Sequence, residues 1–201
     1  MTKPELFIIE SLGRDDEKDD LLEGGHISKM LSLSGSESHY VYIRTTRELE
    51  MAIKEFKRSD CRYLHISCHG NQTGIGLTLD GLTFEELGDM LRPVLKGRRV
   101  FFSSCSVMNK RCAKSLLQTS GCISVIGPST DIYFDRAAAF WCAFYHLCLR
   151  DDAKSIKHEQ LVASVSGLAR LFGVDMRYYQ TSKKEAEGFR LVNLDTEGVS
   201  A

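Results

Sequence analysis

The stretch RYLHISCHG, residues 62–70, decides the fold class of this 201-residue chain. Its composition predicts a strand that Gly70 closes, and the last side chain of that strand is His69. A second stretch, RVFFSS at residues 99–104, predicts another strand and is followed at once by Cys105. Two predicted strands, one ending at a histidine and the other followed by a cysteine, indicate a sheet with a candidate active site at the strand ends.

The segments on either side alternate between strand and helix patterns. LFIIESL at 6–12 starts as a continuous apolar run, which is typical of a strand buried on both faces. Strands are also predicted at 39–44 and 122–126, with one or two more between 174 and 194; helical patterns lie around 21–27 and at 49–56, 84–95, 110–118, 135–149 and 160–171. Asp80-Gly81, between two short β-prone runs, predicts a hairpin within residues 74–84.

Two helix starts carry the spacing of a capping box, Thr45 with Glu48 and Thr83 with Glu86. Strand–helix alternation at this spacing predicts an α/β fold, a three-layer sandwich in which helices cover both faces of a mainly parallel central sheet. We expect residues 1–201 to form a single domain, because no internal repeat or linker interrupts the alternation.

The charge balance excludes several classes of partner. Lys and Arg total 26 against 27 Asp and Glu, which leaves a net charge of −1 and no basic field for nucleic acid or an anionic membrane surface. The most apolar late stretch, 137–149, is interrupted by His146 and too short to span a bilayer, and the first residues lack the shape of a signal peptide. We therefore expect a cytoplasmic protein whose seven cysteines stay reduced.

His69 and Cys105 stand at the carboxyl ends of predicted strands, where open α/β sheets bind their ligands. If the two strands are neighbours, about 4.8 Å apart, the imidazole can take the thiol proton and leave a thiolate that attacks a carbonyl carbon. Gly70 allows a close backbone approach, and its N–H together with that of Cys105 can form an oxyanion hole. The pattern indicates a His–Cys dyad, with a packed histidine and a buried thiol as the alternative.

These stretches resemble a known family. LHISCHG at 64–70 is similar to the strand-then-His-Gly element of caspase-like cysteine peptidases, and VFFSSC at 100–105 to their strand-then-cysteine element. The resemblance is greatest to the CHAT branch, in which the His-Gly pair is followed by a hairpin and a short helix. It covers residues 62–149, where the Phe144-Tyr145 pair matches an aromatic pair on a later helix of that branch.

The chain also departs from the family pattern. The caspase signature Q-A-C-[RQG]-G is absent, since Cys105 is flanked by SS and SV. His69 and Cys105 are 36 residues apart, against about 50 in caspases. Relatives specific for basic residues often carry an acidic residue two positions before the cysteine, where this chain has Ser103. The cleavage preference therefore does not follow from the resemblance.

The resemblance implies a cysteine endopeptidase that cuts specific protein targets, in a regulated system of bacterial antiviral defence or cell death. Cys105 would be the nucleophile, His69 the acid and base, and the amides of Gly70 and Cys105 the oxyanion hole. Activation would come from a partner protein or from self-association. Two other classes compete: a caspase-like binding or regulatory module without catalysis, and a receiver-like domain, which would need an Asp at the end of a central strand.

The side chain that a substrate presents before the cut bond is expected to meet Ser103, Asp131 or Arg14. Asp131 follows the predicted strand at 122–126 and would pair with Arg or Lys; the simpler and safer interpretation is a cap or turn residue before the helix that starts at Asp135. Arg14, in the loop after the first strand, would select Asp or Glu instead. We favour recognition of a basic residue by Asp131.

The remaining Cys, His and Asp residues have simpler interpretations. His65 is expected to be a buried, hydrogen-bonded imidazole, and Cys68, on the opposite face of its strand from His69, a core residue. Asp15 and Asp16 are interpreted as a solvated acidic loop. Cys112, Cys122, Cys142 and Cys148 lie on apolar faces and are expected in the core.

The cysteines and histidines near this sheet edge could instead bind a zinc ion. Its ligands would come from Cys61, His65, Cys68, His69, Cys105 and Cys112. Strand alternation divides the first members of this set between two faces, and the chain contains no CxxC pair. We therefore expect neither a metal nor another cofactor.

Overall fold

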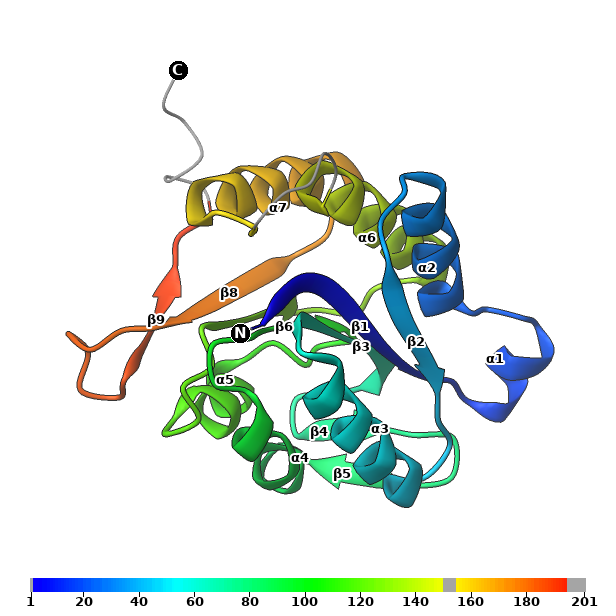
Figure 1. Ribbon diagram of the computed structural model, residues 1–201, viewed down its shortest axis with the longest axis horizontal. Helices are drawn as coiled ribbons and strands as arrows, with labels where there is room; N and C mark the ends of the chain where they lie inside the picture. Colours follow the sequence, from blue (N-terminus) through cyan, green and yellow to red (C-terminus); the bar gives the residue numbers. More distant parts are fainter. Residues whose placement is uncertain (1, 150–154, 195–201) are drawn as a thin grey trace.

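The computed structural model describes residues 2–149 and 155–194, through which a nine-stranded sheet runs (Figure 1). The strands are β1 (Lys3–Ser11), β2 (Ser38–Tyr42), β3 (Cys61–Gly70), β4 (Gly74–Gly76), β5 (Gly81–Thr83), β6 (Arg99–Ser103), β7 (Ser124–Pro128), β8 (Met176–Thr181) and β9 (Phe189–Val192). The helices are α1 (Arg14–Lys18), α2 (Glu23–Leu33), α3 (Thr46–Ser59), α4 (Phe84–Leu91), α5 (Lys110–Leu117), α6 (Phe134–Leu149) and α7 (His158–Phe172), with a 3-10 turn η1 at Arg92–Val94.

The sheet has the order β2-β1-β3-β6-β7-β8-β9, and the hairpin β4–β5 extends from β3. The strands from β2 to β7 in this order pair in parallel, whereas β8 and β9 are added antiparallel beyond β7. Helices α2, α6 and α7 cover one face, and α3, α4 and α5 cover the other (Figure 1). The predicted three-layer α/β sandwich is therefore confirmed.

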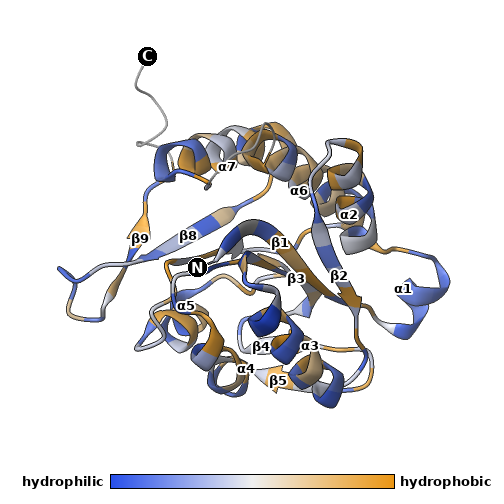
Figure 2. Cartoon of the chain, viewed as in Figure 1, coloured by the Kyte–Doolittle hydropathy of each residue, from blue (hydrophilic) through white to orange (hydrophobic). Residues whose placement is uncertain are grey.

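Each face of the sheet buries its own apolar core. In Figure 2 β1 and β3 are largely hydrophobic, whereas α1 at the rim is hydrophilic. On the α6 side, Phe101 of β6 packs edge-on against Trp141 and Tyr145, with ring centroids 5.9 and 5.8 Å apart. All three side chains are fully buried, and such pairs add roughly 0.5–1.5 kcal/mol beyond the area they bury. They hold α6 against the strand that leads to Cys105.

Helix α6 forms from the most apolar late segment of the sequence, and it packs on the sheet through Phe140, Trp141 and Phe144, all buried. Within the described ranges, no helix is long and apolar enough to cross a membrane.

Both predicted capping boxes and the predicted hairpin are present. The side chains of Thr45 and Thr83 accept hydrogen bonds from the backbone at the starts of α3 and α4, and the Glu side chain of each box accepts one from the N–H of the cap residue. The hairpin β4–β5 pairs antiparallel. Gly74 is required there, because a Cβ at this position would lie 2.0 Å from the carbonyl oxygen of Leu82.

Several element boundaries differ from the sequence-based prediction, and three of the differences have a clear local origin. Residues 14–18 form the short helix α1 where a loop was expected. Strand β7 begins at Ser124 rather than at Cys122, because the Cys122 N–H donates to the Ser120 hydroxyl at 2.9 Å in a turn. Helix α4 ends at Leu91 and continues only as η1, where Pro93 lacks an N–H and cannot extend an α-helix.

Candidate active site

The two strands that carry the predicted dyad are neighbours in the sheet, as expected. β3 and β6 pair in parallel, and their register sets Ser67 opposite Ser103. His69 lies two residues beyond Ser67, and Cys105 two residues beyond Ser103. Both residues therefore leave the sheet at the same edge. The His69 side chain is half exposed, and Cys105 is partly exposed.

Gly70 lets the chain after His69 approach the loop that follows Cys105. A Cβ at Gly70 would lie 2.3 Å from Cγ2 of Val107 and 3.1 Å from the carbonyl oxygen of Cys105. The first distance is too short for any side chain, so the approach requires glycine. It brings the backbones of Gly70 and Cys105, the two predicted oxyanion-hole residues, next to each other.

The imidazole of His69 is oriented by Asp16, which the sequence analysis wrongly placed in a solvated loop. Nε2 of His69 donates a hydrogen bond to the Asp16 carboxylate over 2.6 Å, from β3 to α1. Because a carboxylate only accepts, the proton of this bond belongs to Nε2, and Nδ1 is left free to take a proton from a thiol. Phe134, the first residue of α6, places its ring edge-on to the imidazole at 5.9 Å.

Helix α1, which presents Asp16, is held at the sheet edge by the next residue. The Glu17 carboxylate accepts hydrogen bonds from the Tyr42 hydroxyl and from Nε of Arg44, the latter at 2.9 Å. These bonds hold the pKa of Glu17 below its usual value, with the Tyr42 bond as the larger cause. The only sign of Asp16 in the sequence is its place in the acidic segment that follows β1. Asp15 and Glu17 lie in the same segment, so only the folded structure shows which of the three contacts His69.

The loop after β7 closes over Cys105. Sγ of Cys105 lies 3.5 Å from both the backbone nitrogen and the carbonyl oxygen of Ile132, which belongs to this loop. The next residue, Ser106, has a φ of +55°, and its N–H donates to the carbonyl of Thr130 at 3.0 Å. A non-glycine residue in this region costs about 1–2 kcal/mol, and such a conformation persists only where surrounding contacts hold it, here the bonds of Ser106 to Thr130 and Asp131.

The three residues expected to meet a substrate side chain have different surroundings. Asp131 is exposed and accepts a hydrogen bond from the Ser106 hydroxyl at 2.9 Å, which joins it to the cysteine loop. Arg14 is exposed on α1 and lines a surface depression together with Glu17, Lys18, Arg44, Thr78 and Leu79. Ser103 is buried, and its hydroxyl donates to Glu23 at 2.7 Å.

A buried polar cluster lies beneath the dyad, and the sequence analysis identified only its histidine. His65 is fully buried and shares a hydrogen bond of 2.9 Å with the Tyr145 hydroxyl, as predicted. Its Nε2 lies 3.4 Å from Oε1 of Glu23. Nearby, Glu10 of β1 accepts the Gly24 N–H at 2.7 Å, and burial raises its pKa. Neither glutamate stands out in sequence, because isolated acidic residues are usually on the surface.

Burial raises the pKa of the other six thiols, those of Cys61, Cys68, Cys112, Cys122, Cys142 and Cys148. The pKa is about 12 for Cys68 and Cys122 and about 11 for Cys148. The expectation of core positions holds for all the late cysteines except Cys142, which is only partly buried. Thiolate chemistry at these positions is therefore suppressed.

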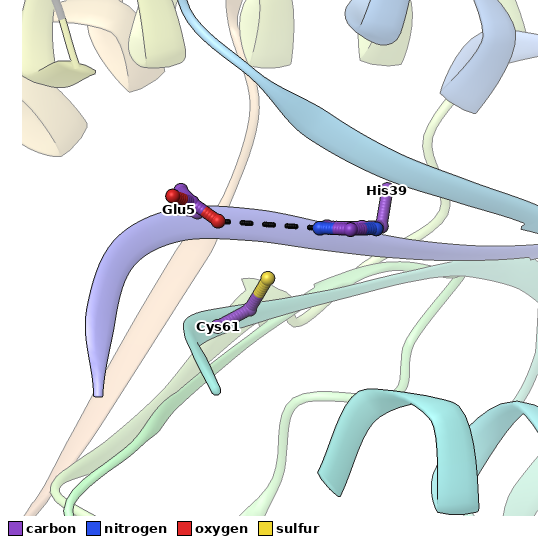
Figure 3. Close-up of side chains that lie close together, drawn as sticks. All are labelled: Glu5, His39 and Cys61. Carbon is purple, nitrogen blue, oxygen red and sulfur yellow. Dashed lines mark ion pairs between the residues drawn. The ribbon is translucent and has the colours of Figure 1, made fainter. Parts of the chain in front are cut away.

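Among the residues that the structure describes, one group of side chains meets the distance requirement for sharing a metal ion. Glu5, His39 and Cys61, on β1, β2 and β3, have ligand atoms within 4.8 Å of one another (Figure 3). Glu5 and His39 form an ion pair at 4.0 Å, and the Cys61 thiol beneath them is buried with a raised pKa. Metals bind the thiolate, so this protonated thiol opposes a site. The zinc set considered from sequence does not assemble among the described residues.

The mostly parallel sheet with helices on both faces is a caspase-like α/β fold, and solved structures share it. A secreted C11 cysteine protease from Bacteroides thetaiotaomicron, "iotapain", matches with a TM-score of 0.57 at 10% identity, over 90% of this chain and 67% of that one. Caspase-1 from Spodoptera frugiperda matches with a TM-score of 0.52 at 14% identity, over 95% of this chain and 85% of that one. No family model and no curated protein matches the sequence.

We predict that brief treatment of the folded protein with iodoacetamide at pH 8 alkylates Cys105 before any other described cysteine. A thiol with a pKa of about 12, such as Cys68, is ionised at pH 8 in roughly one molecule in ten thousand. Peptide mass mapping over time measures the order of modification. Alkylation of Cys68 or Cys122 at the same rate as Cys105 would contradict the assignment, and alkylation in denaturant provides the control for intrinsic reactivity.

Proposed function

We propose that this chain is a cysteine endopeptidase in which His69 and Cys105 form the dyad. The observation that carries the proposal is the placement of an imidazole, oriented by Asp16 at 2.6 Å, and a partly exposed thiol at the ends of two adjacent parallel strands. The fold shared with two solved cysteine proteases supports the same chemistry. No metal or other cofactor is needed for it.

In the proposed mechanism Nδ1 of His69 takes the Cys105 proton, and the thiolate attacks the carbonyl carbon of the cut bond. The N–H groups of Gly70 and Cys105 stabilise the resulting oxyanion. The imidazolium then protonates the amine as the C–N bond breaks, which leaves a thioester. Water, deprotonated by the same imidazole, attacks the thioester and releases the acid and the thiol.

We also propose that the enzyme is regulated, as expected for a protease of bacterial defence or cell death related to the CHAT branch. The backbone of Ile132 lies against Sγ of Cys105, and Phe134 against the His69 ring. A substrate carbonyl needs the space beside Sγ, so this loop has to move first. Its movement would be driven by a partner protein or by self-association, in the cytoplasm, with a protein as the substrate.

Substitution of the dyad tests this function. We predict that Cys105→Ala abolishes peptide cleavage and that His69→Ala lowers kcat/KM by about 10²- to 10⁴-fold, both without unfolding the protein. His65→Ala should instead reduce the free energy of unfolding by roughly 2 kcal/mol, because it leaves buried polar partners unpaired. Cleavage by Cys105→Ala at the wild-type rate would refute the mechanism. A wild-type protein that cleaves no peptide and has an unreactive Cys105 would favour the binding module.

The contribution of Asp16 gives a second prediction. Asp16→Asn should lower kcat/KM by about tenfold or more, since an amide no longer fixes the proton on Nε2 of His69. Asp15→Asn is the matched control, because Asp15 is almost fully exposed and pairs with Lys18 at 2.6 Å. Equal activity of the two variants would remove Asp16 from the site.

The substrate preference is tested by profiling a peptide library. We predict cleavage after Arg or Lys, through a charge-assisted pair with Asp131 beside the Cys105 loop. Asp131→Asn should reduce that preference, whereas Arg14→Gln should leave it unchanged. A preference for Asp or Glu that Arg14→Gln removes would assign recognition to Arg14. A basic preference that survives Asp131→Asn would exclude Asp131.

A further inference from the structure

Glu23 is a buried carboxylate that joins the two strands of the dyad. It is the first residue of α2 and only 3% exposed. Its Oε2 accepts hydrogen bonds from the hydroxyls of Ser67, on β3, at 3.2 Å and of Ser103, on β6, at 2.7 Å. A single oxygen atom thus contacts both strands from the α2 side.

The two serines stand at equivalent positions relative to the dyad. Ser67 and Ser103 are opposite each other in the β3–β6 register. Ser67 is two residues before His69 within β3, a distance of about 6.6 Å along a strand, and Ser103, the last residue of β6, is two residues before Cys105. Since side chains two apart on a strand share a face, Ser67 and His69 lie on the same face of β3. Glu23 therefore contacts the last residue pair of the β3–β6 ladder, which lies just before His69 and Cys105.

The rest of the Glu23 environment is costly for a carboxylate. Its other oxygen, Oε1, lies 3.4 Å from Nε2 of His65, and neither of these buried atoms has a hydrogen-bond partner in the described structure. An apolar side chain of similar size is often at least as stable at such a position as an ion pair. The carboxylate is thus not explained by the stability of the core.

We propose that Glu23 is a positioning residue, which holds the ends of β3 and β6 at the separation that lets His69 take the proton of Cys105. This inference rests on the proposed function. Glu23 touches neither dyad side chain in the described contacts; it acts through Ser67 and Ser103. Without its carboxylate the two hydroxyls lose their shared acceptor, and the backbone beyond the last pair of the ladder, Ser67 and Ser103, is held less firmly.

Glu10 provides a matched control. It is also a fully buried glutamate in the same layer, but it accepts hydrogen bonds from the Gly24 N–H and the Tyr40 hydroxyl, both at 2.7 Å. These bonds fix the start of α2 and the edge strand β2 and do not reach β6. Glu10→Gln therefore disturbs the same region without removing the link between the dyad strands.

The test measures the rate constant of Cys105 alkylation by iodoacetamide in the full chain, for the wild type, Glu23→Gln, Glu10→Gln and His69→Ala. We expect Glu23→Gln to react about tenfold more slowly than the wild type, close to His69→Ala, because a small misplacement of reacting groups costs one to two orders of magnitude. Glu10→Gln should react at the wild-type rate. Wild-type reactivity in folded Glu23→Gln, or an equal loss in Glu10→Gln, would overturn the proposal.

Peptide turnover separates positioning from substrate binding. With the library peptide that the wild type cleaves fastest, Glu23→Gln should lower kcat and leave KM and the residue preference unchanged. A raised KM or an altered preference at unchanged kcat would place Glu23 in the substrate pocket and overturn the proposal. If the wild type is no more reactive toward iodoacetamide than His69→Ala, the proposed function itself fails.

Single hydroxyl deletions keep the test decisive if Glu23→Gln does not fold. Ser67→Ala and Ser103→Ala each remove one of the two bonds and little volume. We expect both to slow the alkylation of Cys105 severalfold. Ser120→Ala is the control, because that buried hydroxyl bonds to the Leu116 carbonyl at the end of α5. Equal rates in all three serine variants would overturn the proposal.

Discussion

The parallel pairing of β3 with β6 is the constraint on which the candidate site depends. His69 and Cys105 are 36 residues apart in the chain, and the hairpin β4–β5, α4 and η1 lie between them. The register of the two strands nevertheless brings both to one edge, because the ladder leaves each backbone little freedom. A slip by one residue would turn every side chain of a strand to the opposite face and separate the dyad.

The same pairing explains the polar layer beneath the site. A parallel strand buried on both faces is normally apolar, yet β3 carries His65 and Ser67 and β6 carries Ser103, all buried. In the described structure the two serine hydroxyls donate to Glu23, and His65 bonds to Tyr145 and lies 3.4 Å from Glu23. Because a buried polar group without a partner is costly, the layer permits few arrangements of the strands. These buried polar contacts therefore favour one arrangement of β3 and β6 at the sheet edge.

The likeness to solved proteases concerns the fold and does not extend to the side chains around His69 and Cys105. The shared fold, at 10% and 14% identity, accounts for the sheet order and the helical layers. The contacts of Asp16 on α1, of the Ile132 backbone with Sγ of Cys105 and of the buried polar layer are made by individual side chains, and the shared fold does not imply them. They make the site a local arrangement of side chains on a common scaffold. Ile132, in the loop after β7, contacts the Cys105 thiol, and Phe134, the first residue of α6, contacts the His69 ring, so this stretch of chain borders both side chains.

The sequence by itself determined the parts of this protein that depend on local patterns. The strand and helix segments, both capping boxes, the β4–β5 hairpin and the strand-end positions of His69 and Cys105 follow from residue types at short spacing. Only the tertiary structure decided the partners of the acidic residues around the candidate site. Asp16, Glu10 and Glu23 acquire theirs from elements between 14 and 80 residues away. Several acidic residues look alike in the sequence, and long-range packing determines which of them bonds to a distant element. A local sequence pattern therefore cannot predict these partners.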